Sequence, residues 1–176
     1  MQQQLFGGSW TQKKLECLSK YLTAYTTIFK RNPKAKYFRI SYVDAFAGTG
    51  HMPATDLPLS EMMPELTEGA EEYQKGSVIR ALEVEPGFDQ YIFIERDKGR
   101  SEELRAVKKR FPDKDILIET ANANDYLKTW CKAFNSRTSR GVLFLDPFGM
   151  SVNWEAIELI AKTRAIDLWI LFRSLL

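Results

Sequence analysis

The stretch that most constrains the fold runs from Ile40 to Gly50 and reads ISYVDAFAGTG. Its first part, ISYV, is short, largely apolar and partly β-branched, which is typical of a strand at the centre of a parallel sheet covered on both faces. Asp44 follows at the carboxyl end of this strand, where open α/β sheets bind their ligands. Gly48 and Gly50 come next, and glycine allows both a positive φ and a close approach of the backbone to a bound molecule. The stretch therefore predicts a ligand site at the tip of a central strand.

The glycine turn lacks the motif residues of two common classes of nucleotide-binding site, which narrows the choice of ligand. A nucleoside triphosphate site needs the run G-x-x-x-x-G-K-[ST], and the sequence contains none. A dinucleotide site needs a third glycine three residues after the second, and Pro53 stands there. Because a carboxylate at Asp44 would repel a pyrophosphate and attract an ammonium or sulfonium group, the turn favours a nucleoside with a positively charged tail. S-adenosylmethionine carries both of these groups.

Four blocks of the sequence carry a resemblance to known families. The run VDAFAGTG at 43–50 resembles the first motif of class I methyltransferases, in the F-x-G-x-G form common among nucleic-acid methyltransferases. From about Thr11 onward, the chain also resembles the three-Cys-motif partner (TcmP) family. The blocks that carry this resemblance are VDAFAGTG, the strand end FIE at 93–95, LDPFG at 145–149 and DLWILF at 167–172. The resemblance implies a Rossmann-like sheet, S-adenosylmethionine as cofactor and a three-Cys-motif protein, encoded nearby, as partner.

The ends of the other predicted strands supply the remaining cofactor-binding candidates. Glu95 ends the second strand, where a carboxylate can accept hydrogen bonds from both ribose hydroxyls; an exposed strand-end charge is the alternative. Asn122, with Asn124 as second choice, lies where the related enzymes carry a side chain that meets the adenine. Turn chemistry alone would equally explain both asparagines. The predicted cofactor-binding residues are Asp44, Phe46, Gly48, Gly50, Glu95 and Asn122.

The block Asp146-Pro147-Phe148-Gly149 supplies the candidate catalytic residues. It resembles the [DN]-P-P-[FY] motif of amino-methyltransferases, so Asp146 is expected to orient the methyl acceptor or take its proton, with Phe148 beside it. In this chain the aromatic residue comes one place early, which argues against amino-methylation of adenine or cytosine. Cytosine C5 methylation needs a thiolate nucleophile, and no Pro-Cys pair lies near the block.

The alternation of strand and helix patterns predicts an α/β fold with a mostly parallel sheet of order 3-2-1-4-5 and helices on both faces, truncated at its C-terminus. Residues 1–39 are expected to form a basic helical segment that packs on the sheet, with its helix beginning at Thr11, and residues 40–176 to form the Rossmann-like domain. Residues 51–75 are acidic and contain three prolines, so they are expected to be an insertion that either covers the cofactor or is disordered. Strands are predicted at 40–43, 90–95, 115–119, 141–145 and 166–172, and helices at 11–31, 78–82, 99–111, 126–134 and 152–163.

Two further expectations concern burial near the C-terminus. In the last helix, Trp154, Ile157, Ile160 and Ala161 are predicted to face the core. Trp169 and Leu171 are predicted to lie on an uncovered sheet edge, which would make the chain poorly soluble alone.

The net charge of +2 conceals an uneven distribution along the chain. Residues 1–40 hold eight Lys or Arg and one Glu, a charge of +7, whereas residues 41–85 hold two bases and nine acids, a charge of −7. The basic arm either follows a nucleic-acid backbone or is a solvated face beside the acidic segment. The sequence contains neither a signal-peptide core nor a long apolar run, and its two cysteines lie far apart, so a cytoplasmic protein without a metal site is expected.

These features predict an S-adenosylmethionine-dependent methyltransferase-like domain, with nucleic acid as one class of acceptor. Two alternatives stay open. The first is a non-catalytic module that binds the cofactor or assembles with a three-Cys-motif protein, and the second is a nucleic-acid-binding accessory protein.

Overall fold

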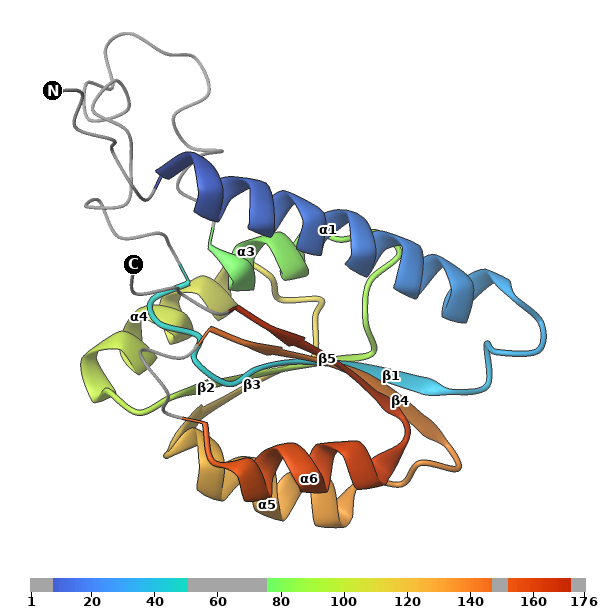
Figure 1. Ribbon diagram of the computed structural model, residues 1–176. Coiled ribbons are helices and arrows are strands. Elements are labelled where there is room, and N and C mark those ends of the chain that lie inside the picture. Colours follow the sequence, from blue (N-terminus) through green and yellow to red (C-terminus); the bar gives the residue numbers. More distant parts are fainter. Residues whose placement is uncertain (1–7, 51–75, 147–151, 172–176) are drawn as a thin grey trace, which may run out of the picture.

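The computed structural model describes residues 8–50, 76–146 and 152–171, which form a five-stranded sheet with helices on both faces (Figure 1). All neighbouring strands are parallel and follow the order β3-β2-β1-β4-β5, which confirms the predicted topology. The strands are β1 Arg39–Asp44, β2 Gln90–Glu95, β3 Ile116–Thr120, β4 Ser139–Leu145 and β5 Ile166–Ile170. The helices are α1 Gly8–Arg31, α3 Ser77–Leu82, α4 Lys98–Lys109, α5 Ala123–Ala133 and α6 Trp154–Thr163.

The two faces of the sheet have different cores. Helices α1, α3 and α4 cover one face, and α5 and α6 cover the other (Figure 1). Because successive strand side chains point to opposite faces, each central strand contributes to both cores. The face under α1 holds mainly aromatic strand residues: Tyr42, Tyr91, Phe93 and Phe144. The opposite face holds aliphatic ones: Val43, Ile92, Ile94, Leu143 and Leu145.

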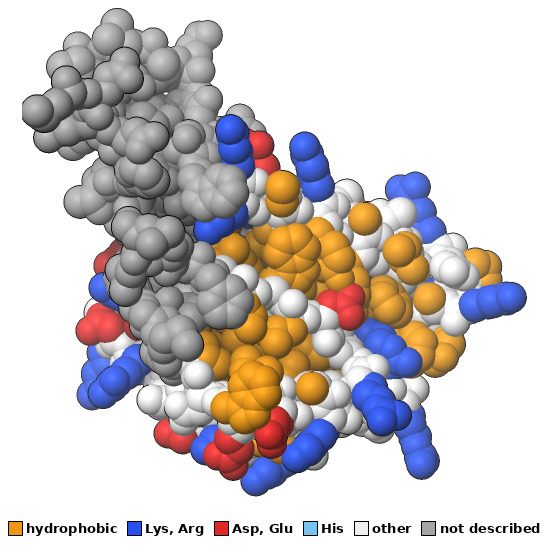
Figure 2. Space-filling view, viewed as in Figure 1, with side chains coloured by type: hydrophobic (Ala, Val, Ile, Leu, Met, Phe, Trp, Pro, Cys, Tyr) orange, Lys and Arg blue, Asp and Glu red, His pale blue; other side chains and the backbone are white. Residues whose placement is uncertain are grey.

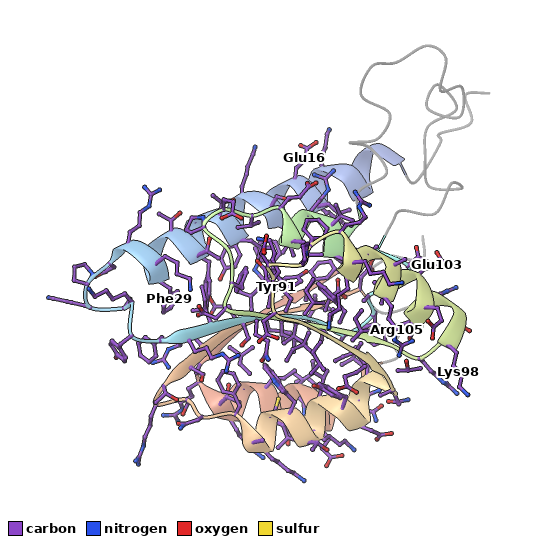
Figure 3. All side chains as sticks on the ribbon, turned by 180° about the vertical axis from the view of Figure 1, so that it is seen from behind. Glu16, Phe29, Tyr91, Lys98, Glu103 and Arg105 are labelled. Atoms are coloured by element: carbon purple, nitrogen blue, oxygen red, sulfur yellow. The ribbon has the colours of Figure 1, made fainter. Side chains whose placement is uncertain are left out.

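Helix α1 is fixed to the aromatic face by one stripe of residues. Its side chains at spacings of three and four are buried or partly buried against the sheet, as the sequence predicts: Leu15, Leu18, Leu22, Tyr25 and Phe29. Figure 3 shows Phe29 and Tyr91 in the layer between α1 and the sheet, whereas Glu16 projects away from it. The helix therefore packs along the sheet instead of standing apart as a separate arm.

Two helices begin three residues earlier than predicted. Helix α1 begins at Gly8 instead of Thr11. Helix α5 begins at Ala123 instead of Tyr126, because Asn122 caps it: the Oδ1 atom of Asn122 accepts the backbone N–H of Asn124 at 2.9 Å. The asparagine-rich run that suggested a loop is thus the first turn of a helix.

The predicted burial of α6 is wrong at two positions. Trp154 is 73% exposed, and Ala161 is also exposed, whereas Ala156 and Ile160 are buried. Ile157 is partly buried. Trp154 is the first residue of the helix, and its Nε1–H donates to Glu158 Oε1 at 3.0 Å, which holds the indole along the outer surface. The inward stripe is therefore shifted from the one that the apolar residue types suggest.

The β5 edge is less bare than predicted. Trp169 and Leu171 are partly buried against the aromatic core, and the Trp169 ring lies 4.9 Å from that of Tyr21 on α1. The hydroxyl of Tyr21 also donates to Asp167. Apolar side chains nevertheless gather on the surface between α1 and α6 (Figure 2).

The predicted insertion at 51–75 lies outside the described residues. Within the described ranges, no helix has the length and apolar character to cross a membrane, and no three potential metal ligands come together.

We expect Ile160→Ala to lower the free energy of unfolding by about 2–4 kcal/mol, because it leaves a cavity in the aliphatic core. Trp154→Ala, although it removes a larger side chain, is expected to change that free energy by less than about 1 kcal/mol, because the indole is mostly in solvent. Urea unfolding of both variants measures the difference. Equal losses would show that Trp154 is part of the core.

Candidate functional site

Three acidic residues meet where strands β1, β2 and β4 end. Asp44 is the last residue of β1, which pairs in parallel with both other strands. Glu95 ends β2 and Asp146 follows β4, so both lie at the same edge of the sheet. The negative charges of Asp146 and Glu95 both help to raise the pKa of Asp44, so each of these two residues lies within electrostatic reach of Asp44. The structure thus brings together the strand-end carboxylates that the sequence singled out.

The Asp44 carboxylate is buried and already has hydrogen-bond partners. It has no solvent exposure, and it accepts the Ser77 hydroxyl at 2.5 Å and the backbone N–H of Phe46 at 3.2 Å. The pKa of Asp44 is raised to about 7, chiefly by burial; the two hydrogen bonds lower it, and the charges of Asp146 and Glu95 make smaller contributions that raise it. A ligand ammonium would therefore have to replace the Ser77 hydroxyl to reach this carboxylate.

Ser77 is the site residue that sequence reasoning missed. It is the first residue of α3, and its bond to Asp44 ties the start of that helix to the tip of the central strand. The sequence pattern predicts a helix over 78–82 and gives Ser77, the residue before it, no role. A hydroxyl at the start of a helix on an α/β sheet would have been the signal for a partner of the strand-end carboxylate.

The glycine turn after β1 has one packed side and one open side. Both glycines have positive φ, 60° at Gly48 and 83° at Gly50, as expected for a tight turn. A Cβ on Gly50 would meet Leu104 at 3.4 Å and Val78 at 3.5 Å, so that residue is enclosed by α3 and α4. A Cβ on Gly48 would meet no atom of the described residues within 4 Å. Gly48 is therefore the point at which a ligand has room to approach the backbone.

Glu95 links this turn to the loop after β2. Its Oε2 accepts the backbone N–H of Gly48 at 2.9 Å, and its Oε1 accepts that of Asp97 at 2.8 Å. The residue is 9% exposed. A carboxylate has about four acceptor sites, so two backbone bonds leave capacity for a further donor. Glu95 is thus a fixed acceptor beside the open side of the turn, and its role toward a ribose stays a prediction.

The remaining predicted residues differ in how much the structure says about them. Asn122 is exposed and uses Oδ1 to cap α5, while Asn124 accepts the backbone N–H of Asn153 at 2.8 Å with its own Oδ1 and so connects α5 to the start of α6. Phe46 is partly buried against the aliphatic core. Asp146 is partly buried, and Phe148 lies outside the described residues. The adenine and acceptor roles of these residues stay predictions.

A hollow of about 750 Å³ lies away from the three carboxylates. Its lining comes from the loop before β4 and the end of α6: Ser136, Glu158, Ala161, Lys162, Thr163 and Arg164. Because helices of this fold run opposite to the strands, the end of α6 lies at the amino-terminal edge of the sheet. The hollow is therefore separate from the candidate cofactor site.

Comparisons with known proteins agree with the sheet topology. The order β3-β2-β1-β4-β5 is that of a Rossmann-like sheet. A Legionella pneumophila protein described as a member of family DUF519 superposes with a TM-score of 0.55 at 15% identity, covering 90% of this chain and 62% of that one. The chain thus spans less than two thirds of that protein.

Two other solved structures give TM-scores below 0.5. A conserved hypothetical protein of Streptococcus pyogenes matches with a TM-score of 0.43 at 15% identity, covering 77% of this chain and 66% of that one. An Escherichia coli protein provisionally described as a methyltransferase matches with a TM-score of 0.47 at 16% identity, covering 93% of this chain and 66% of that one. No protein-family model and no curated protein matches the chain, so the resemblance to the TcmP family stays a prediction.

The raised pKa of Asp44 predicts a specific dependence of stability on pH. Between about pH 4 and pH 7 the folded protein retains a proton that the unfolded chain, with an ordinary pKa of 3.8, has released. The free energy of unfolding should therefore fall as pH rises through this window and level off above it, with a slope of up to about 1.4 kcal/mol per pH unit from this group.

Urea unfolding from about pH 4.5 to pH 8 measures this slope in the wild type and in Asp44→Asn. We expect the variant to lack the Asp44 contribution, so that the two stability curves converge or cross as pH changes. Asp113→Asn, which alters an exposed carboxylate, serves as the control and should keep the wild-type slope. Parallel curves for wild type and Asp44→Asn would contradict the assigned pKa.

Proposed function

We propose that this chain is an S-adenosylmethionine-dependent methyltransferase-like domain that binds its cofactor at the edge where β1, β2 and β4 end. The observation that carries the proposal is the turn at Gly48, which has a positive φ and room on one side and whose N–H is held by Glu95. This turn lies at the tip of the strand where the sheet order reverses, the position at which open α/β sheets bind ligands.

The charges at this edge suit a nucleoside with a cationic tail. Glu95 and Asp146 give the edge a negative potential, to which Asp44 adds above its raised pKa of about 7, and this potential favours sulfonium and ammonium groups over pyrophosphate. In the proposed complex, Gly48 admits the cofactor, and Glu95 uses its remaining acceptor capacity for the ribose hydroxyls. Phe46 and Gly50 shape the turn, and Asn122 meets the adenine. Asp44 binds the methionine ammonium, which takes the place of the Ser77 hydroxyl.

The bound cofactor would supply a methyl group on a positively charged sulfur. The task of the chain is then to hold an acceptor against that group, and orientation alone supplies a large part of such an acceleration. Asp146, at the end of β4, is proposed to orient the acceptor or to take its proton, with Phe148 beside it. Nucleic acid is the proposed class of acceptor, because the turn has the F-x-G-x-G form that is common among nucleic-acid methyltransferases.

One observation favours a second candidate function, a non-catalytic module that assembles with a three-Cys-motif protein, as the TcmP resemblance implies. The Asp44 carboxylate is fully buried and accepts the Ser77 hydroxyl, so it can serve to hold α3 against β1 without any ligand. Such a module would keep the sheet and the buried bond without binding the cofactor.

Calorimetry with S-adenosylmethionine and S-adenosylhomocysteine tests the proposal. We expect the wild type to bind both, and Gly48→Ala to lose at least about tenfold in affinity because the new Cβ occupies the space left for the ligand. The left-handed backbone at Gly48 should cost this variant only about 1–2 kcal/mol of stability, so it remains folded.

Gly141→Ala is the matched control, since Gly141 lies in β4 away from the glycine turn, its φ is not positive and a Cβ there would meet no atom closer than 3.5 Å. It should bind both compounds like the wild type. If the wild type binds neither compound, the non-catalytic module is the better account. If Gly48→Ala binds as tightly as the wild type, the turn is not the cofactor site.

A further inference from the structure

Two long segments of the chain lack acidic residues, and the sheet brings them together. Residues 17–43 contain six Lys or Arg and no Asp or Glu, and residues 126–145 contain four Lys or Arg and no Asp or Glu. These segments include β1 and β4, which pair in parallel, with Arg39 opposite Ser139. The loops that precede the two strands are therefore neighbours, and the backbone N–H of Arg39 donates to the carbonyl of Thr138 at 3.0 Å. Cations from both segments gather at this amino-terminal edge of the sheet.

We call this surface the basic edge and define it by the loops at 31–39 and 134–140. Figure 1 places both loops at the right-hand end of the molecule, and in Figure 2 blue Lys and Arg side chains predominate over that end. Its cationic residues are Arg31, Lys34, Lys36, Arg39, Arg137 and Arg140. The three strand-end carboxylates lie at the opposite edge of the sheet.

Among the described residues, most of this positive charge has no carboxylate partner. Arg39 pairs with Asp115 at 3.1 Å. In the described parts of the chain, Arg31, Lys34, Lys36 and Arg137 form no ion pair with a carboxylate. A run of unneutralised cations on adjoining loops is the electrostatic signature of a surface that binds a polyanion.

An exposed aromatic residue lies among these cations. Tyr37 is 66% exposed, and its ring centroid lies 4.1 Å from that of Phe38. The guanidinium of Arg140 lies 3.7 Å from the Phe38 ring centroid on the same surface. Aromatic rings interleaved with cations provide a platform on which an unpaired base can stack, whereas duplex DNA and a lipid surface make no such use of an exposed ring.

Both loops are held in shape by their own hydrogen bonds. Asn32 Oδ1 accepts the backbone N–H of Lys34 at 2.9 Å, and Asn135 Oδ1 accepts that of Arg137 at 3.1 Å. The carbonyl of Ser136 also accepts Arg140 Nη1 at 2.5 Å. Because the loops are ordered before any partner arrives, binding need not order them at a free-energy cost. The hollow that begins at Ser136 is lined by Glu158, Lys162 and Arg164, and Lys162 pairs with Glu158 at 3.9 Å, so Arg164 is the residue that adds positive charge toward the end of α6.

We propose that the basic edge binds single-stranded nucleic acid, with the phosphate backbone along Lys34, Lys36 and Arg137 and a base stacked on Tyr37. The surface lies at the opposite edge of the sheet from the proposed cofactor site, so it anchors the polymer and does not present the reacting atom. The inference does not depend on cofactor binding.

Fluorescence anisotropy of the full chain with a labelled, mixed-sequence single strand of about 20 nucleotides tests the charge component across a series of salt concentrations. We expect the double variant Lys34→Ala/Lys36→Ala to bind at least about tenfold more weakly at low salt. Its log–log salt dependence should be shallower by about 1.4, because each lost phosphate contact in a single strand removes about 0.7.

The matched control is Lys108→Ala/Lys109→Ala, which removes two adjacent exposed lysines from α4 and should leave binding unchanged. Absence of binding by the wild type at low salt, or an equal loss in the control, would overturn the proposal. Binding to vesicles containing anionic lipid, without binding to the oligonucleotide, would also overturn it in favour of a membrane surface.

Tyr37 tests the single-strand component. Tyr37→Ala should weaken single-strand binding about fivefold or more, whereas Tyr37→Phe, which retains the stacking ring, should bind like the wild type. If a duplex of the same length binds as tightly as the single strand and Tyr37→Ala has no effect, the surface is not a single-strand site. Calorimetry with S-adenosylmethionine on the lysine variant should give wild-type affinity, so failure of this proposal is distinguishable from failure of the proposed function.

Discussion

The burial of the Asp44 carboxylate at the tip of the central strand is the constraint on which this end of the structure depends. A carboxylate without access to water is costly unless donors compensate it, and here the donors are the Ser77 hydroxyl and the backbone N–H of Phe46. Those bonds require α3 to begin at Ser77, beside the tip of β1, and the chain to turn directly after Asp44. The glycine turn is then closed from the other side by Glu95, which accepts the N–H of Gly48. One buried acid and one bridging acid thus determine the geometry of the proposed cofactor edge.

Two of the predicted cofactor-binding residues also form part of the framework. Glu95 holds two loops together with the two oxygens that were expected to meet a ribose, and Asn122 caps a helix with the oxygen that was expected to lie near an adenine. These bonds leave donor or acceptor capacity in each side chain, since a carboxylate has about four acceptor sites and an amide retains its NH₂ group. Fixing such a group by its own backbone bonds also lowers the entropy lost when a ligand binds.

The parallel sheet separates two charge environments along the direction of its strands. All strands run the same way, so acids that follow strands collect at one edge and bases that precede β1 and β4 collect at the other. The acidic tips suit a small cationic nucleoside, and the basic edge suits a polyanion. The small net charge of +2 therefore combines an acidic edge with a basic edge. Under the two proposals, a polymer and a cofactor would bind at opposite edges of the sheet.

The sequence by itself determined the strands, their order and the gathering of acidic strand ends, because runs such as YVDAF and IFIE combine buried apolar residues with a terminal carboxylate, and both signals are local. Local pattern also predicted the inward stripe of α1. Only the tertiary structure decided that Ser77 meets Asp44, that Trp154 lies in solvent and that the loops before β1 and β4 form one surface. The contact of Ser77 with Asp44 and the meeting of the two loops join residues that are far apart in sequence, and no periodic pattern relates them. The exposure of Trp154 depends on which side of α6 the neighbouring elements cover. The spacing of apolar residues along the chain determines which face of each helix or strand is apolar. The packing of the elements in three dimensions determines which residues that face contacts.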